Sequence, residues 1–545
     1  MDAVGETAHA PGTGGMARWE WAALTAVLIV AGALRIWHLD WALPHELDSN
    51  EPIYLRIAAR LAEEGGTNPH LFSRAHLMTT INRAAIALVR AAGNPPRGIR
   101  SDQIMLWFQA DPQPFYLTAR GAMVLLGLIS IVIIHRYGRT VGGPVAGLVA
   151  AAMLGVCSVH VGATKNIAGD APLILALIAV PFATHRFLLD KRLYSLMWAF
   201  AWVGVAGGAK INDAMFGGIP ALALLLTARE AGPGRTIFRA ALGGLCAFLG
   251  FFAANFYVVF HPKLAYIGFM YQWGLAGEPH FWAEPVSALV EYSRILGLDL
   301  GLVGLLGGVL VLARAPREGR RPHLPAICLG AVYFLFMVSK KLHYPRYILP
   351  MVPILAPYCG LAVARVAAAI RGGALRAVAV AACLAILGAR GVKETWSTET
   401  LKGRGDTRIL ASEWCIANLP DGACIATEPR AVQLPDVKEF ERAGMTPSNR
   451  GPALSIWGGK AFRVLQPWNV GEMTLAQYRE KGVKYLAIAG WTWERMRSRG
   501  GYDAQFSAAD ETLAASRAIA RFSPTRSEGG DLDGPFIVIY EIPDR

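Results

Sequence analysis

Two acidic residues, Asp48 and Glu51, follow directly after the first long apolar run, in the stretch PHELDSNEP. Ionisable side chains at the edge of a membrane are energetically costly, so they are candidates for function. The other ionisable groups that interrupt apolar sequence in this way are His160, Lys165, Asp170, Lys210, Asp213, Lys340, Lys341, His343 and Arg346. The set combines carboxylates, which can accept a proton, with cations, which can hold an anion.

Such a set suits the attack of a hydroxyl group on a sugar linked to a lipid phosphate. The phosphate is a good leaving group, so one carboxylate to take the proton and cations to hold the phosphate would suffice. Arginine offers a bidentate fork and lysine a point charge. A divalent ion held by Asp48, Glu51 and Asp170 is an alternative use of the carboxylates, because hard cations take oxygen ligands. No spacing demands one, so metal and cofactor dependence stay open.

The same residues also have structural interpretations. Ser49 or Asn50 can cap a helix that has Pro52 in its first turn, and acids are favoured there by the helix dipole. Capping and catalysis carry equal weight at this point. Asp170 can similarly cap the apolar run that follows it. Lys340 and Lys341 can be flanking residues whose ammonium groups reach the membrane interface.

The composition predicts a membrane protein. Of 545 residues, 54% are hydrophobic and only 17% are charged, whereas about 25% are charged in soluble domains. The net charge of +13 would suggest nucleic acid as a partner of a soluble protein. Here the basic residues lie in short connectors between apolar runs, where they set topology. Membrane lipids, and no nucleic acid, are therefore the expected partners.

About 20 apolar residues span a bilayer. By this criterion eleven spans are expected, at residues 19–38, 115–135, 142–160, 171–189, 195–211, 213–228, 236–260, 290–313, 322–340, 345–368 and 374–391. The first is too long for the core of a signal peptide and lacks a small-residue cleavage site, so it is expected to be a retained anchor.

The basic residues predict the orientation. Alternate short connectors carry 15 Lys and Arg on one side and six on the other. The positive-inside rule places the first set in the cytoplasm. The N-terminus is then cytoplasmic, and the chain after the eleventh span lies outside a bacterial-type cytoplasmic membrane.

Three long insertions then face outward, at residues 39–114, 261–289 and 392–545. In the first, Ile53, Ile57 and Leu61 recur at helical spacing, with Tyr54 and Ala58 beside them. Arg56, Arg60, Glu63 and Glu64 take the opposite side, which predicts an amphipathic helix suited to the membrane surface. A second such helix is expected at 77–92. We therefore expect a transmembrane catalytic domain at 1–391, including the 39–114 loop, and a soluble domain at 392–545.

The tail predicts a small α/β domain. Helices are expected at 406–419 and 507–522, and strands at 423–428, 484–490 and 535–542. Cys415 and Cys424 are either a disulfide or two buried free thiols. The expected fold class is thus an α-helical polytopic membrane protein with about eleven spans and a small exported α/β domain.

Four stretches resemble the GT-C glycosyltransferases of the protein O-mannosyltransferase and lipid A aminoarabinose transferase type (glycosyltransferase family 39). These are the acidic residues before GGTNPHLF, the segment SVHVGATKNIAGDAPLILAL, the element HYPRYILPMVPIL, and DTRILASEWCIANLPDGACIATEP. The motifs are short, but the resemblance extends over most of the chain.

The resemblance implies specific roles. The outer-loop acidic pair, usually an adjacent Asp-Glu, falls on Asn50-Glu51, with Asp48 two residues earlier, so whether Asp48 or Glu51 is the base stays open. Asp170 matches the second acidic position. Lys210, His343 and Arg346 match the groups for the lipid phosphate. His160, Lys165, Lys340 and Lys341 are further candidates at the same membrane face.

The expected function is an inverting membrane glycosyltransferase that moves a hexosyl or pentosyl group from a polyprenyl-phosphate donor to an acceptor hydroxyl of a protein, lipid or glycan. One alternative is a flippase of lipid-linked sugars. Inverted repeats and broken helices are typical of transporters, and the sequence shows neither. A second alternative is a membrane-anchored glycan-binding protein, although a simple anchor has no use for the charges at the outer face. The sugar, the acceptor and the oligomeric state are open.

Overall fold

The structure is a computed structural model that describes residues 15–48, 50–72, 76–276, 285–314, 316–339, 345–499, 501–524 and 532–543. Its contacts divide the chain into two compact units. Unit 1 comprises residues 1–37, 67–81 and 120–395, and unit 2 comprises residues 38–66, 82–119 and 396–545. Most of the first long loop thus packs with the C-terminal residues. The expected domain boundaries at 391 and 392 remain a prediction.

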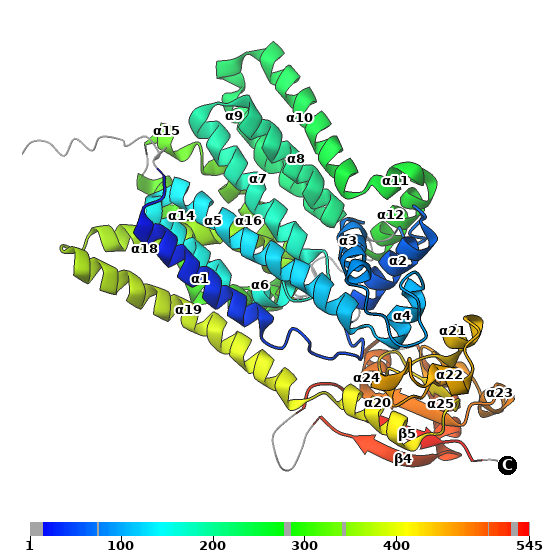
Figure 1. Cartoon of the computed structure of the whole chain (residues 1–545). Coiled ribbons are helices and arrows are strands. Elements are labelled where there is room, and N and C mark those ends of the chain that lie inside the picture. Colours follow the sequence, from blue (N-terminus) through cyan, green and yellow to red (C-terminus); the bar gives the residue numbers. More distant parts are fainter. Residues whose placement is uncertain are drawn as a thin grey trace, which may run out of the picture. The chain divides into compact units, whose positions relative to one another are not determined.

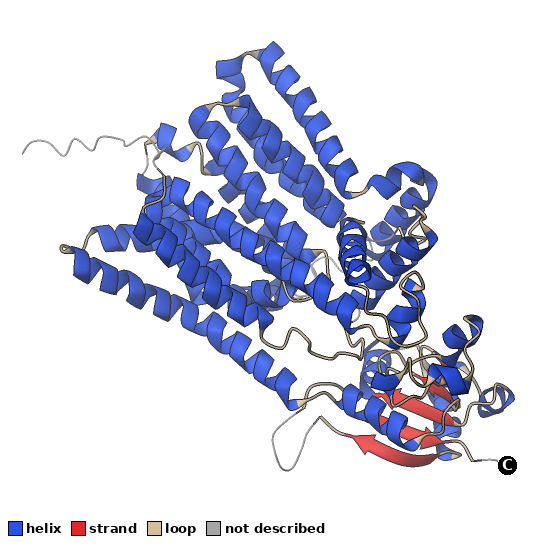
Figure 2. Ribbon diagram, viewed as in Figure 1, coloured by secondary structure: helices blue, strands red, loops and turns tan. Residues whose placement is uncertain are grey.

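Helices make up unit 1 (Figures 1 and 2). They are α1 (Arg18–Ile36), α5 (Gln113–Val156), α6 (Ser158–Ala163), α7 (Asp170–Asp190), α8 (Leu193–Ala209), α9 (Gly218–Ala231), α10 (Pro233–Ala254), α11 (Phe256–Phe260), α12 (Pro262–Ala276), α13 (Pro285–Leu296), α14 (Val303–Arg314), α15 (Arg317–Arg320), α16 (Leu324–Val338), α17 (Pro345–Ile348), α18 (Val352–Ala368) and α19 (Gly373–Arg404), of which α5 and α19 extend into unit 2. Three short turns of other helix type are η1 (Ile211–Gly217), η2 (Gly297–Leu302) and η3 (Leu349–Met351).

Within the described residues, seven helices are long and apolar enough to cross a membrane, or eight if the bent pair Leu289–Leu296 and Leu300–Ala313 is one span. Two shorter apolar helices, Leu193–Ala209 and Leu324–Val338, add to these. Each of the eleven expected spans overlaps at least one helix of the described residues. The number that cross the bilayer remains a prediction.

Helix α5 contains two of the expected spans. Its 44 residues would make a rod of about 66 Å, far longer than a bilayer requires. The backbone is not helical at Gly142 and Gly143, where φ is +84° at Gly143. A Cβ on Gly147 would lie 2.6 Å from the carbonyl oxygen of His135, so the two arms fold back on each other. The segment is a helical hairpin whose turn needs glycine.

Helices α8 and α10 also approach closely, and Figure 1 shows α7, α8, α9 and α10 side by side. A Cβ on Gly204 would lie 2.0 Å from the carbonyl oxygen of Ala247, and one on Gly250 would lie 2.1 Å from that of Ala201. Small residues allow such backbone contact between membrane helices, where dispersion forces drive packing.

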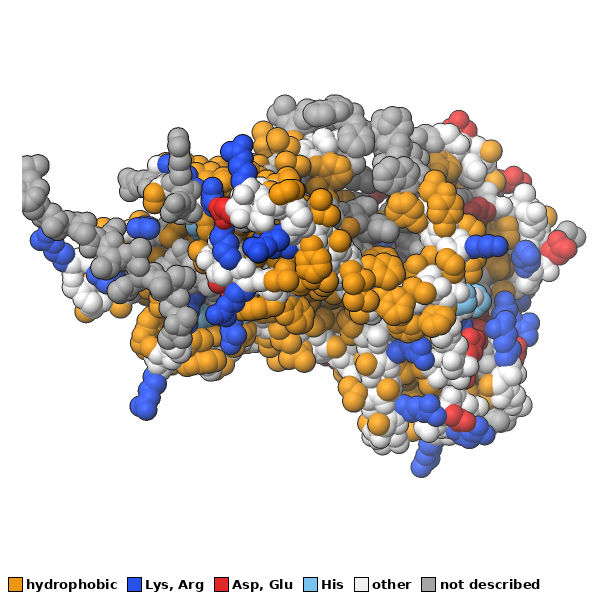
Figure 3. Space-filling model, turned by 90° about the horizontal axis from the view of Figure 1, so that it is seen from above, with side chains coloured by type: hydrophobic (Ala, Val, Ile, Leu, Met, Phe, Trp, Pro, Cys, Tyr) orange, Lys and Arg blue, Asp and Glu red, His pale blue; other side chains and the backbone are white. Residues whose placement is uncertain are grey.

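The surface of unit 1 is suited to lipid. Helices α7 and α18 are mostly buried, whereas α10 and α19 are mostly exposed. The exposed side chains are large and apolar, for example Phe238 and Phe248 on α10 and Ile386 on α19. Figure 3 shows apolar side chains over much of the visible face, with Lys and Arg gathered in separate groups. Contiguous exposed apolar surface of this kind marks contact with a membrane.

Unit 2 contains α2 (Glu51–Glu64), α4 (Ile104–Ala110), most of α3 (Leu77–Ala92) and the C-terminal domain. The helix expected around Ile53, Ile57 and Leu61 is confirmed as α2, and the helix expected at 77–92 is confirmed as α3. The buried face of α2 is formed by Tyr54, Leu55, Ala58 and Leu61, whereas Ile53 and Ile57 are only partly buried. Three of the five apolar residues expected on this face, Tyr54, Ala58 and Leu61, are thus buried, and Leu55 joins them.

The C-terminal domain is a mixed five-stranded sheet with strand order β2-β1-β3-β5-β4 (Figure 2). The strands are β1 (Cys424–Thr427), β2 (Arg463–Leu465), β3 (Tyr485–Ala489), β4 (Arg517–Phe522) and β5 (Ile537–Glu541). Strands β1, β2 and β3 are parallel, and β5 is antiparallel to β3 and β4. The helices are α20 (Thr407–Asn418), α21 (Val437–Arg442), α22 (Pro447–Arg450), α23 (Leu475–Glu480), α24 (Gly490–Arg499) and α25 (Asp503–Ala514), with short turns η4 (Ser455–Trp457) and η5 (Val470–Glu472).

Alternate strand residues face two cores. Ile425 and Ala487 pack with Cys415 of α20, whereas Ala426 and Leu486 pack with Tyr478 of α23. This is the period of two that a pleated strand imposes. The predicted α-helical fold with a small C-terminal α/β domain is confirmed.

Two details of this domain needed the structure. The helix expected at 507–522 is wrong beyond Ala514, because Arg517–Phe522 forms the edge strand β4 paired with β5. Its alanines and arginines favour helix locally, but pairing with β5 overrides that preference. Cys415 and Cys424 are both free thiols. Burial raises the pKa of the Cys415 thiol to about 12.

Candidate active site

Asp170 and Lys210 meet where α7 begins and α8 ends. Gly169 and Ala209, the residues just before them, bring the two backbones together, since a Cβ on Gly169 would lie 3.0 Å from the carbonyl oxygen of Ala209. The Lys210 ammonium donates to Oδ1 of Asp170 and forms an ion pair with it. The structure therefore brings together two of the residues that the sequence singled out.

Asp213 completes this cluster. It lies in η1, three residues after Lys210, and its side chain is buried. It interacts electrostatically with both Lys210 and Asp170. The ammonium of Lys210 is thus bonded to Asp170, and Asp213 is a second carboxylate nearby. This geometry favours Lys210 as the partner of Asp170 more than as a free ligand for phosphate.

Arg346 lies on the short helix α17 and is exposed. Its guanidinium carbon lies 5.6 Å from the ring centroid of Tyr347. The carbonyl of Tyr347 accepts a hydrogen bond of 2.6 Å from the Tyr333 hydroxyl. Tyr333 on α16 also packs against Phe216, with ring centroids 5.3 Å apart, and Phe216 lies in η1 together with Asp213. Tyr333 therefore contacts both the Arg346 helix and the turn that carries Asp213.

Three other candidates, Lys340, Lys341 and His343, lie outside the described residues. Their proposed contact with donor phosphate stays a prediction.

His160 belongs to a buried polar network. Its Nδ1 lies 2.7 Å from an Arg35 guanidinium nitrogen, which can only donate, so Nδ1 is the acceptor. Nε2 then carries the proton and donates to the Ser130 hydroxyl at 3.1 Å. Arg35 also donates to the Thr164 hydroxyl at 2.9 Å and to the Gly155 carbonyl at 2.9 Å. The network ties α1 to α5 and α6.

Lys165 supports the same junction, because its ammonium donates to the carbonyl of Trp37 at the C-terminal end of α1. A cation there also interacts favourably with the helix dipole. The contacts of His160 and Lys165 are thus those of a scaffold that fixes α1.

Asp48 and Glu51 belong to unit 2. Asp48 Oδ1 accepts from the backbone N–H of Asn50 at 2.7 Å and of Glu51 at 3.2 Å. Asp48 is therefore the capping residue of α2, whereas Asn50 makes no side-chain capping bond and Ser49 lies outside the described residues. Glu51 is almost fully buried at the first position of the helix.

Asp48 is only partly buried and has a second carboxylate oxygen, so capping through Oδ1 leaves it available for chemistry. The cap fixes its side chain against the helix, which is the preorganisation that a general base requires. The structural and the chemical interpretations of this stretch are thus compatible in one geometry.

A metal site is not apparent. Among the described residues, no group of three or more His, Cys, Asp or Glu is placed to hold an ion. A divalent ion held by Asp48, Glu51 and Asp170 stays a prediction, because these residues belong to different units. No step of the chemistry is derived through a metal.

Sequence reasoning gave no role to Asp213, Tyr333 or Arg35. The sequence showed Asp213 as an ionisable residue near Lys210, but it did not predict the turn η1 in which Asp213 lies. Arg35 has a signal of its own, a charge inside the first apolar span. Tyr333 has only a polar tip within an apolar run, which needs the fold to locate its partner.

Residues 117–257 match a family model described as dolichyl-phosphate-mannose-protein mannosyltransferase. A comparison with curated proteins finds no match. The crystal structure of ArnT from Cupriavidus metallidurans bound to undecaprenyl phosphate is similar at 14% identity and a TM-score of 0.54, over 96% of this chain and 98% of that one. The apo structure of the same protein gives 13% identity and a TM-score of 0.55, over 96% and 97%.

The two structural similarities extend over nearly the whole chain, whereas the family model matches residues 117–257. They confirm the predicted resemblance to GT-C glycosyltransferases of the protein O-mannosyltransferase and lipid A aminoarabinose transferase type. The chain is a multi-pass membrane protein with the GT-C fold.

Proposed function

We propose that this GT-C-fold membrane protein is a glycosyltransferase that moves a sugar from a polyprenyl-phosphate donor to an acceptor hydroxyl. The observation that carries the proposal is the clustering of Asp170, Lys210 and Asp213 at helix ends inside a fold whose solved example holds undecaprenyl phosphate. Buried charges without a function would only cost stability in a membrane. The match to a mannosyltransferase family model supports the same class of donor.

The chemistry is a single displacement. The acceptor oxygen forms a bond to the anomeric carbon, and the bond from that carbon to the phosphate oxygen breaks with its electron pair leaving on the phosphate. The hydroxyl proton passes to a carboxylate. One displacement inverts the anomeric configuration, so we expect an inverting enzyme.

The carboxylates serve the transfer of the proton, and the cations serve the binding of the phosphate. Asp48 is the proposed base, because it is partly exposed and its capping bonds to the start of α2 hold it in place. The buried Glu51 orients either Asp48 or the sugar. Asp170, fixed by Lys210, contributes the remaining carboxylate.

Arg346 is the proposed ligand of the donor phosphate. Its exposed guanidinium can offer a bidentate fork to phosphate oxygens. His343, Lys340 and Lys341 precede it in the sequence and would add cations to the same site.

One experiment both tests the proposed function and identifies the acceptor. Mass spectrometry of envelope glycans, lipids and proteins from a strain lacking this gene should show the loss of one sugar from one class of molecule. An unchanged envelope, under conditions where the gene is expressed, would argue against the transfer of sugar.

A further inference from the structure

Three consecutive residues just before Asp48 each contact the C-terminal domain. We call His45, Glu46 and Leu47 the docking segment. The His45 ring lies edge-on to Trp457, with centroids 5.3 Å apart. The Glu46 carboxylate accepts from the Gln433 side-chain amide at 3.3 Å. The Leu47 carbonyl accepts from the Arg408 guanidinium at 3.4 Å.

Arg408 is itself held rigidly. Its Nε donates to Asp406 Oδ1 at 2.8 Å, and a terminal nitrogen donates to Oδ2 at 2.5 Å. Both side chains are buried, and Arg408 also lies 5.0 Å from the ring centroid of Trp491. A bidentate Arg–carboxylate pair has a fixed geometry as well as strength.

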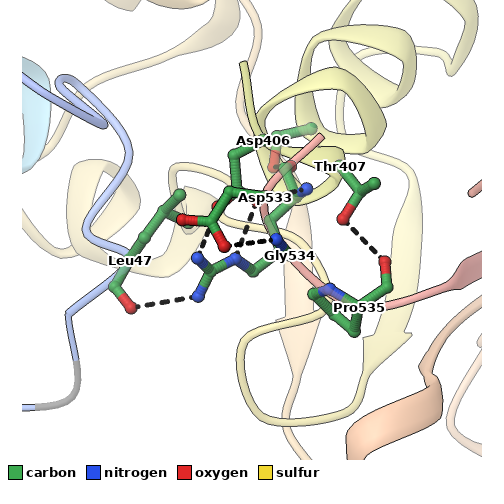
Figure 4. Close-up of polar contacts among 8 residues, drawn as sticks. Leu47, Asp406, Thr407, Asp533, Gly534 and Pro535 are labelled. Carbon is green, nitrogen blue, oxygen red and sulfur yellow. Dashed lines mark hydrogen bonds and ion pairs between the residues drawn. The ribbon is translucent and has the colours of Figure 1, made fainter. Parts of the chain in front are cut away.

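The surroundings of Asp406 are equally well bonded, as Figure 4 shows. The backbone of Asp406 forms a bridge with that of Asp533, and the neighbouring Thr407 hydroxyl donates to the carbonyl of Pro535 at 2.6 Å. Figure 4 also shows Leu47 reaching this group from a different part of the chain. The C-terminal domain thus presents a preformed receptor for the docking segment.

The Leu47 carbonyl is part of the peptide bond to Asp48. Asp48 Oδ1 in turn holds the N–H groups of Asn50 and Glu51. A continuous series of bonds therefore runs from Asp406 through Arg408 and Leu47 to Asp48, Asn50 and Glu51, which we call the acidic segment. The Arg408–Leu47 bond is long, so the other two contacts of the docking segment share its task.

We propose that the C-terminal domain is a positioning element for the acidic segment, with Arg408 as the positioning residue. This rests on the proposed function, because it assigns the domain to the same reaction. A displacement of about 1 Å in a reacting group can reduce the rate by as much as about 10²-fold. Loss of the Arg408 contacts should therefore lower kcat while leaving donor binding intact.

The test uses the full-length protein and a charge-balanced variant, Arg408→Met with Asp406→Asn. Asparagine keeps the helix-capping ability of Asp406, and the double change leaves no buried charge unpaired. The matched control is Arg450→Met with Asp421→Asn. This pair lies in the same domain, with Arg450 buried and bonded to both Asp421 oxygens at 2.8 and 2.7 Å, and neither residue belongs to the docking contacts.

Two quantities are measured on each variant: kcat and donor KM for sugar transfer, and the hydrogen-exchange rate of the Asn50 and Glu51 amides. For the Arg408 variant we expect kcat to fall at least about tenfold, KM to stay within about twofold, and exchange to accelerate. The control should keep wild-type values of all three. Arg408→Lys should lie between wild type and the double variant, since one ammonium cannot span Asp406 and Leu47.

Wild-type kcat in the Arg408 variant, or equal losses in the Arg408 and Arg450 variants, would overturn the proposal. The exchange measurement needs no activity. Should the wild-type protein transfer no sugar, the proposed function fails, and unchanged exchange in the Arg408 variant would separately refute the positioning.

Discussion

At the scale of single residues, Oδ1 of Asp48 caps helix α2, and the other carboxylate oxygen is available to accept a proton. Asp48→Asn keeps the cap, because an amide oxygen also accepts from the Asn50 and Glu51 amides. It removes the proton acceptor. Turnover should therefore fall by about 10²–10⁴-fold while folding and donor binding persist.

Glu51→Gln is the comparison for Asp48→Asn. Glu51→Gln should lower turnover less than Asp48→Asn does, because a glutamine can still hydrogen-bond to the sugar. Transfer assays on both purified variants, with donor binding as the control for folding, decide between the two acids. A dead Glu51→Gln beside an active Asp48→Asn would reverse the roles, and two active variants would leave this stretch as a helix cap only.

The Asp170–Lys210 pair predicts a stability effect. Lys210→Met leaves Asp170 and Asp213 without their ammonium, and breaking a buried pair costs roughly 3–5 kcal/mol. Because the Lys210 side chain is 35% exposed, the loss should be near or below the lower end of that range. Thermal unfolding in detergent measures it, and adding Asp170→Asn should recover part of the stability.

Lys191 provides the control for this measurement. It pairs with Glu230 at 3.2 Å, but both side chains are about half exposed. Such surface pairs contribute about 0–1 kcal/mol, so Lys191→Met should hardly change the melting temperature. Equal effects of the two substitutions would show that the Asp170 pair is solvated and that its buried geometry is wrong.

At the scale of elements, the sequence predicted the helices well, because runs of apolar residues have few alternatives in a bilayer. The turn of the α5 hairpin has a readable signal in Gly142-Gly143-Pro144. The strand β4 had none, because RAIARF favours helix until β5 lies beside it. Leu55 was missing from the predicted buried face of α2, because a periodicity cannot identify what covers a helix.

The docking segment predicts a dependence on pH. Burial lowers the pKa of His45 to about 4, although a hydrogen bond with the Gln433 backbone and the charge of Asp406 favour the protonated ring. In the unfolded chain the histidine pKa is about 6.5. The unfolded state therefore binds more protons between pH 6.5 and 4, and the free energy of unfolding falls as the pH is lowered through that window, by up to about 1.4 kcal/mol per pH unit.

His45→Phe removes this contribution and keeps an aromatic ring against Trp457. Glu428 acts with the opposite sign, since burial raises its pKa to about 7 and its contribution to stability declines as the pH rises from about 4.5 to 7. Glu428 is present in both wild type and His45→Phe, so its effect drops out when the melting temperatures of the two proteins are compared at each pH. On acidification the melting temperature of wild type should fall relative to that of His45→Phe. An unchanged difference would show that His45 is not buried at the docking contact.

At the scale of the whole molecule, the candidate site could be predicted only in part. The ionisable residues were visible as interruptions of apolar sequence, but their pairing depends on contacts distant in sequence, such as Gly169 against Ala209. The grouping of residues 38–66 with 396–545 had no local signal at all. Contacts such as Leu47 with Arg408 join positions 361 residues apart.

The orientation in the membrane is a separate prediction of the basic connectors. With 15 basic residues against six, residues 392–545 should lie outside the cytoplasm. A periplasm-active reporter fused after Arg545 should be active, and one fused after truncation within 318–320 should be inactive. The reverse pattern would place the candidate residues of the outer loops in the cytoplasm and overturn the site.

The central claim is that the protein consumes a lipid-linked sugar. The most direct measurement reconstitutes the purified protein in liposomes with polyprenyl-phosphate sugars extracted from the host membrane and an envelope fraction as acceptor. We predict one free polyprenyl phosphate for each sugar transferred, and a rate lower by about 10²–10⁴-fold with Asp48→Asn. Intact donor that moves to the opposite leaflet, with no polyprenyl phosphate released, would contradict the account and identify a flippase.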